Sequence, residues 1–238
     1  MVKLERSEVL GRVTRKDAVS EQGITTWTLI KEAIREKRKN EAIELLSFLR
    51  KECWIDQVAF INKSLAYIAE NHGEQEVEKA LRWWRSVLQK AGDGIYSMSL
   101  EELIQYQCEE IRASLNLGGK DCFSVSEETE RFVISVDPTH ITRLSRATRN
   151  EPAKVLDVTQ ASHPWSWGRT GVPYYCARCC LWWEIMPIEE RGYPIRVHEY
   201  PENPDDPCRI LYYKEPESIP REYFSRVGKE RDPSRFKL

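Results

Sequence analysis

Three cysteines stand within five positions of the apolar segment GVPYYCARCCLWWE, residues 171–184. Side chains three or four positions apart share one face of a helix, so Cys176 points in the same direction as Cys179 or as Cys180. Two thiolates from one helix supply half of a tetrahedral zinc site, and the remaining ligands must come from other parts of the chain. The segment therefore predicts a bound metal ion, most simply zinc.

A carboxylate is expected to face these thiols from the segment PIRVHEY, residues 194–200. Side chains alternate along a strand, which places Glu199 with Ile195 and Val197 on the face that these apolar neighbours mark as the core face. A buried carboxylate without a partner costs several kcal/mol, roughly, and therefore needs a cation, a metal ion or a proton. Glu199 is thus predicted either to bind the metal or to act as a general base beside it.

The other expected ligands come from three further segments. Cys208 opens a strand predicted over 208–213, and it should meet Cys176 where the helix meets the sheet. His163 lies in the segment HPWSWG just before the helix, and His140 follows the apolar strand FVISV. The predicted metal ligands are Cys176, Cys179, His163 and Cys208, with His140 assisting catalysis. His140 is the alternative to His163 as a ligand, Cys180 is the alternative to Cys179, and water can fill an open position.

Whether such a site keeps an open coordination position decides the class of protein. Three protein ligands and one open position let zinc lower the pKa of bound water to about 7 and polarise a carbonyl group. We therefore predict a zinc-dependent hydrolase or lyase that acts on a small molecule, aromatic molecules included. A closed site with four ligands instead predicts a stand-alone small-molecule-binding or sensor module with a structural zinc.

Aromatic side chains near the thiols are candidates for binding a planar substrate. Trp165 and Trp167 lie in the long polar segment before the helix, where tryptophans argue against disorder. They are predicted to cover a pocket and stack on the ligand, with Arg169 and Tyr175 beside them. The alternative is that the two tryptophans only pin the loop to the core.

Two other interpretations of the cysteines stay open. The C-x-x-C pair at the start of a helix is also the pattern of a redox dithiol, with Arg178 and the helix N-terminus lowering a thiol pKa, although no β-α-β unit precedes it as in thioredoxin. A lone cysteine is most often a small apolar core residue, so a scaffold with packed thiols is the third interpretation.

A helix that opens on Cys176, a strand that reaches Glu199 23 positions later, and a turn before Cys208 resemble the 4-vinyl-reductase-type domain, which binds small aromatic ligands in phenol-type bacterial sensors. The resemblance covers about residues 173–214. It implies an α+β fold and a structural zinc site beside a buried aromatic pocket, formed by the helix cysteine, the strand glutamate and a final-strand cysteine. Cys208 lies near the expected position, and Glu202 stands where the family has a further cysteine.

Helical periodicity dominates the first half of the chain. Apolar residues recur at three-to-four spacing over 26–49 and 58–71, and a further helix is expected over 74–91. Ser99 and Glu102 form a capping box that begins a fourth helix, which should end at 116. These helices predict an antiparallel helical layer.

The second half is expected to supply the sheet and the thiols. β-Branched residues in alternation predict strands over 122–125 and 131–136, and the apolar helix over 174–186 should end at Pro187. The predicted fold class is α+β, with a helical layer packed on a small antiparallel sheet and one central buried helix. We expect a flexible arm over residues 1–22, a single domain over 23–214 and a polar tail over 215–238. Within the domain, the helical layer is expected over 23–118, and the sheet with the metal site over 119–214.

Length and charge narrow the classes of partner. A chain of 238 residues with 41% hydrophobic residues can bury one substantial core. The formal net charge of −2 makes nucleic acid an unexpected partner. Neither a secretory signal nor an apolar run of about 18 residues is visible, so we expect a cytoplasmic protein without membrane contact, whose thiols are reduced. The expected partner is a small molecule, and assembly into a homo-oligomer is left open.

Overall fold

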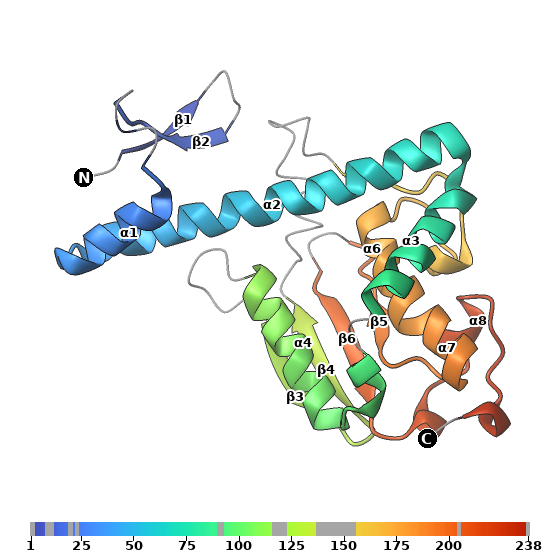
Figure 1. Cartoon of the computed structure of the whole chain (residues 1–238). Coiled ribbons are helices and arrows are strands. Elements are labelled where there is room, and N and C mark those ends of the chain that lie inside the picture. Colours follow the sequence, from blue (N-terminus) through green and yellow to red (C-terminus); the bar gives the residue numbers. More distant parts are fainter. Residues whose placement is uncertain are drawn as a thin grey trace.

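The computed structural model describes residues 3–7, 12–18, 21, 24–89, 93–115, 123–136, 156–203 and 206–236. Within these ranges the chain has an α+β fold, as the sequence predicts, with helices in the first half and a small antiparallel sheet in the second (Figure 1). His140 lies outside the described residues, so its role stays a prediction. No helix in the described ranges is long and apolar enough to span a lipid bilayer.

The first half of the chain is built from the helices α1 (Thr26–Arg35), α2 (Lys39–His72), α3 (Glu74–Gln89) and α4 (Leu100–Leu115). α2 joins the two apolar runs of the sequence into one helix of 34 residues, whose first half projects away from the sheet with α1 alongside it (Figure 1). Gly73 ends α2 with a φ of 92°, in the region that favours glycine, and this lets α3 begin at the next residue.

The predicted capping box at the start of α4 is confirmed. The backbone N–H of Ser99 donates to Oε2 of Glu102 at 2.7 Å, and the backbone N–H of Glu102 donates to Oγ of Ser99 at 3.3 Å. Both bonds satisfy donors that a helix start otherwise leaves unpaired. The cap fixes where α4 begins.

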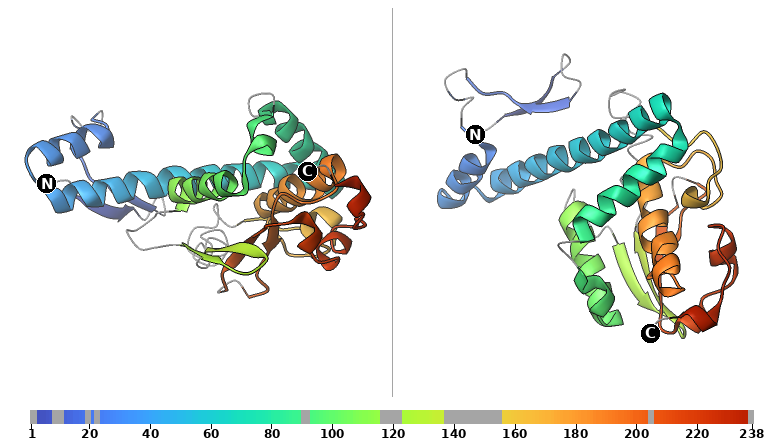
Figure 2. Two further views of the ribbon diagram at one scale, coloured as in Figure 1. Left: turned by 90° about the horizontal axis from the view of Figure 1, so that it is seen from below. Right: turned by 45° about the vertical axis from the view of Figure 1, so that its right-hand side comes forward.

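The main sheet has four antiparallel strands in the order β3-β4-β6-β5. Their bounds are β3 (Phe123–Glu127), β4 (Arg131–Val136), β5 (Val197–Glu199) and β6 (Cys208–Tyr213). One face packs against α4 through side chains that include Ile134, Ile210 and Tyr212. Val133 and Leu211 on the other face join the core built around the central helix (Figure 2).

The central buried helix runs without a break from α6 (Tyr174–Cys180) through a π-helical turn (Leu181–Ile185) to α7 (Met186–Arg191). Ala177, Cys180 and Leu181 are fully buried, as expected of a helix that is apolar on most sides. The prediction that this helix ends at Pro187 is wrong, because the helix continues to Arg191.

The π-helical turn explains how the helix passes Pro187. Proline has no N–H, so it leaves carbonyl groups of the preceding turn without their helical donor. The backbone N–H of Ile195 donates to the carbonyl of Trp183 at 3.1 Å, and the guanidinium of Arg85 donates to the carbonyl of Trp182. Donors from other elements therefore replace the missing helical hydrogen bonds.

Short elements occur among the described residues near both ends of the sequence. The N-terminal residues include an antiparallel hairpin of β1 (Leu4–Ser7) and β2 (Arg12–Arg15). The short helix expected near Tyr223 is confirmed as α8 (Glu222–Ser225). The C-terminal segment also contributes buried side chains to the core, namely Ile219, Phe224 and Val227.

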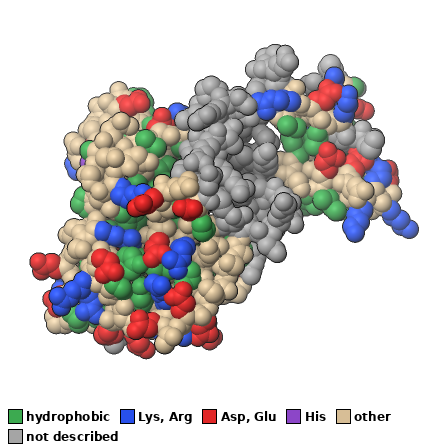
Figure 3. Space-filling model, turned by 180° about the vertical axis from the view of Figure 1, so that it is seen from behind, with side chains coloured by type: hydrophobic (Ala, Val, Ile, Leu, Met, Phe, Trp, Pro, Cys, Tyr) green, Lys and Arg blue, Asp and Glu red, His purple; other side chains and the backbone are tan. Residues whose placement is uncertain are grey.

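Charged side chains of both signs are interspersed over the described residues of the rear face (Figure 3). This matches the balance of 36 basic and 38 acidic residues. The described residues of that face show no large patch of a single sign.

Candidate functional site

Three thiols and one imidazole interact electrostatically between the central helix and the sheet. Cys176 and Cys179 come from α6, Cys208 opens β6, and His198 is the middle residue of β5. Electrostatic interactions link Cys179 with both other thiols, and Cys179 also forms a hydrogen bond with His198. We call these four residues the thiol cluster.

Strand pairing explains why His198 belongs to the thiol cluster. His198 lies opposite Ile210 in the β5–β6 register, and Cys208 precedes Ile210 by two residues. Residues that face each other across two strands, and residues two apart on one strand, share a face of the sheet. His198 and Cys208 therefore lie on the same face of the sheet as Ile210, the face that packs against α4, and Cys179 interacts with both of them.

The pKa of Cys179 is shifted downward, whereas the pKa values of Cys176 and Cys208 are shifted upward. Burial raises the pKa of this half-buried thiol, but the charge and hydrogen bond of His198 and the positive charges of Arg178 and Arg196 outweigh burial and lower the pKa from 9.0 to about 7. Burial raises the pKa of Cys208 to about 12, and it raises the pKa of Cys176 well above its usual value. Cys179 is the thiol of the cluster that ionises near neutral pH.

Glu184 stands behind His198 in the π-helical turn and is completely buried. Its Oε1 accepts hydrogen bonds from the backbone N–H of His198 at 2.9 Å and from Nε1 of Trp167 at 2.8 Å, and it lies 3.4 Å from Nδ1 of His198. Its Oε2 accepts from Arg226 at 2.7 Å. Burial raises the pKa of Glu184, but Arg226 and His198 outweigh it and lower the pKa, so the carboxylate is ionised and holds the strand that carries His198.

Two arginines add positive charge beside Cys179. Arg178 stacks on Tyr175, with 4.6 Å from its guanidinium carbon to the ring centroid, and Arg196 stacks on Trp183 at 3.8 Å. The Nε atoms of both arginines are buried without a hydrogen-bond partner, and neither side chain forms an ion pair with a carboxylate in the described part of the chain. This uncompensated charge favours a thiolate at Cys179.

The other predicted ligands are held elsewhere. Nε2 of His163 lies 2.7 Å from Oε2 of Glu74, and its ring stacks on Trp165 at 4.4 Å between centroids. Glu199 accepts hydrogen bonds from Nη1 of Arg209 at 2.5 Å and from the hydroxyl of Tyr223 at 2.6 Å. The cation that Glu199 needs is therefore an arginine on the neighbouring strand.

The four residues predicted to bind substrate, Trp165, Trp167, Arg169 and Tyr175, all make contacts within the protein. Trp165 is buried, and Trp167 is buried with its Nε1 on Glu184. Nη1 of Arg169 donates to the carbonyl of Tyr200 at 2.9 Å. The hydroxyl of Tyr175 accepts a hydrogen bond from Arg178 at 3.1 Å. These contacts hold the loop and the helix together.

His198 and Glu184 were not among the residues predicted from the sequence. Alternation along PIRVHEY assigns His198 to the face opposite the predicted core face, yet Val197 and His198 are both buried because the edge strand β5 lies against the central helix. The sequence signal that could have found His198 is a C-x-x-C pair followed by a histidine and a third cysteine.

The fit of a metal ion depends on both the donor types and their arrangement. Three sulfurs and an imidazole are donor types that zinc prefers. Across the residues that the structure describes, however, no three His, Cys, Asp or Glu side chains are gathered so that they could hold an ion. The zinc site stays a prediction.

Comparisons with known proteins give no relatives: no family model, no curated protein and no solved structure matches this chain. The resemblance to the 4-vinyl-reductase-type domain is therefore neither supported nor opposed by a relative, and it stays a prediction.

Proposed function

We propose that this protein is a thiol-dependent enzyme in which Cys179 is the nucleophile, His198 the general acid and base, and Glu184 the buried carboxylate that positions His198 through its backbone N–H. The observation that carries the proposal is the contact between Cys179 and His198, backed by a completely buried carboxylate. A nucleophile in contact with a base that a third group orients is the general arrangement of covalent catalysis by cysteine.

The proposed reaction is acyl transfer to water or to a second acceptor. The Cys179 thiolate attacks the carbonyl carbon of an ester, thioester or amide, and the protonated His198 gives its proton to the leaving group. The resulting thioester on Cys179 is then cleaved by a water molecule that His198 deprotonates. Arg178 and Arg196 stabilise the thiolate between turnovers.

A test uses p-nitrophenyl acetate as an activated ester. The protein should release one equivalent of p-nitrophenolate in a rapid phase and carry the acetyl group on Cys179, as peptide mass spectrometry would show. Cys179→Ser should abolish the rapid phase. Cys180→Ser is the matched control, because Cys180 is the next residue but is fully buried and donates to the carbonyl of Pro164. No rapid phase in the unmodified protein, or an equal loss in both variants, would refute the proposal.

Metal binding by the same thiols is the rival proposal. Its support is that Cys176 and Cys179 of α6 interact electrostatically with Cys208 of β6, and Cys179 also interacts with His198 of β5. About one equivalent of zinc in the purified protein, lost in Cys176→Ser and kept in Cys108→Ser, would replace the thiol-dependent enzyme with a zinc protein.

A further inference from the structure

We infer that the cavity beside Arg196 binds a small carboxylic acid with an apolar body. This inference does not depend on the proposed function. The cavity has a volume of about 410 Å³. It lies where the start of α4, the connection from α7 to β5 and the segment after β6 meet, and Arg196 and Val197 are part of its lining.

The lining of the cavity is mostly apolar or aromatic, with side chains that include Ile95, Leu103, Tyr193, Ile195 and Ile219. Such a wall favours a hydrocarbon body, and a few convergent polar groups then fix the orientation of the ligand. The volume suits a molecule of a few to a dozen heavy atoms rather than a chain segment.

Arg196 is the polar group that calls for an anion. Only 4% of its surface is exposed. Its Nη1 donates to the hydroxyl of Tyr212 at 3.1 Å, and its guanidinium lies over Trp183, but its Nε has no hydrogen-bond partner and no carboxylate pairs with it among the described residues. A buried guanidinium without an anion is costly, and a carboxylate is the anion whose geometry it matches.

The other charged groups in the lining are Arg191, Lys214 and Glu215. Arg191 donates to the carbonyl of Tyr96 at 3.1 Å, Lys214 pairs with Glu127 at 2.5 Å, and Glu215 adds a negative charge to the wall. The guanidinium of Arg196 is therefore the group that a single carboxylate on the ligand would pair with.

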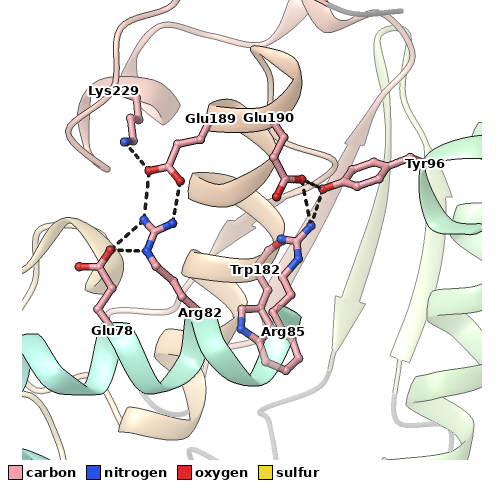
Figure 4. A network of polar contacts seen from close by, with 8 residues as sticks. All are labelled: Glu78, Arg82, Arg85, Tyr96, Trp182, Glu189, Glu190 and Lys229. Atoms are coloured by element: carbon pink, nitrogen blue, oxygen red, sulfur yellow. Dashed lines mark hydrogen bonds and ion pairs between the residues drawn. The ribbon is translucent and has the colours of Figure 1, made fainter. Parts of the chain in front are cut away.

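A network of polar contacts fixes one wall of the cavity (Figure 4). The hydroxyl of Tyr96, a lining residue, donates to Glu190 of α7 and accepts from Arg85 of α3. On the same two helices Arg82 pairs with Glu189 at 2.7 Å. The wall is thus held between α3 and α7 before a ligand arrives, which lowers the ordering cost of binding.

The experiment measures binding of hexanoate and of its neutral analogue hexanamide by calorimetry, using the Cys179→Ser protein so that no covalent chemistry intervenes. Hexanoate should bind at least about tenfold more tightly than hexanamide, since a charge-assisted pair distinguishes them. Arg196→Met in the same background should remove this preference. Lys214→Met is the matched control, because Lys214 lines the same cavity but has its own carboxylate partner, and it should keep the preference.

Three results would overturn the inference: no binding of either compound, equal binding of both, or an unchanged preference in Arg196→Met. The comparison of the two compounds needs no substitution at Arg196, so it holds even where that variant fails to fold. Because the assay protein lacks the nucleophile, a negative result leaves the Cys179 proposal standing. Conversely, a missing rapid phase with p-nitrophenyl acetate leaves the carboxylate site standing.

Discussion

Replacing His198 with glutamine tests whether the imidazole activates Cys179. The three favourable influences together lower the pKa of Cys179 from 9.0 to about 7, and His198 is the largest of them. This shift of about 2 units corresponds to about 2.7 kcal/mol, and His198→Gln should return about one to two units of it. The variant Cys179 should therefore ionise near pH 8 to 9.

The expected change in reactivity is smaller than the change in ionisation. At about pH 7 roughly half of Cys179 is thiolate in the unmodified protein, against about one in a hundred for a pKa of 9. A more basic thiolate is also the better nucleophile, by about sixfold to tenfold over two units. The rate of alkylation at neutral pH should thus fall about twofold to eightfold in His198→Gln, and the pH midpoint of the reaction should rise.

The assay follows alkylation of Cys179 by iodoacetamide across pH, with peptide mass spectrometry to assign the modified residue. His163→Gln is the matched control, because His163 also contacts a carboxylate, Glu74, but stands outside the thiol cluster. An unchanged midpoint in His198→Gln, or the same rise in His163→Gln, would refute the reasoning.

Three further predictions concern stability. Glu184→Gln should lower the free energy of unfolding by about 3–5 kcal/mol in denaturant titrations, because it removes the completely buried carboxylate that pairs with Arg226; a loss below about 1 kcal/mol would contradict this prediction. Hydrogen bonds lower the pKa of Glu74 although burial raises it, so the contribution of Glu74 to stability is present above its usual pKa and is lost as pH falls. Glu74→Gln should therefore speed hydrogen exchange in the loop that carries His163 and reduce the acid sensitivity of that loop. The Cys179 thiolate stabilises the fold at pH values above its unfolded pKa of about 9, and this stabilisation is lost as pH falls through about 7. The difference in free energy of unfolding between the unmodified protein and Cys179→Ser should therefore grow by up to about 2.7 kcal/mol from pH 6 to pH 9. A difference that shrinks with rising pH would contradict the lowered pKa.

The elements of the fold were predictable where local signals are strong. The strands β4 and β6 begin and end where β-branched alternation places them, and the capping box of α4 forms as expected. The end of the central helix was not predictable, because the donors that let it pass Pro187 come from distant residues, Arg85 and Ile195. Proline stops a helix only where the freed carbonyl groups find no other partner.

Sequence spacing pointed to the thiols but not to His198 or Glu184. It singled out Cys176, Cys179 and Cys208, which interact electrostatically in the structure, and their role as metal ligands stays a prediction. Strand alternation assumes that only one face of a strand is buried, and β5 is an edge strand with both faces covered. That is why Glu199, rather than His198, was expected to face the thiols.

The most direct test of the central claim is a titration of the Cys179 side chain by NMR, with carbon-13 in the cysteine β-carbons and with the metal content of the sample measured beforehand. We expect a metal-free Cys179 thiol whose signal shifts with a midpoint near pH 7. Cys176 and Cys208 should stay protonated at that pH. A midpoint near pH 9, or a signal that does not titrate because the sulfur carries zinc, would contradict that claim.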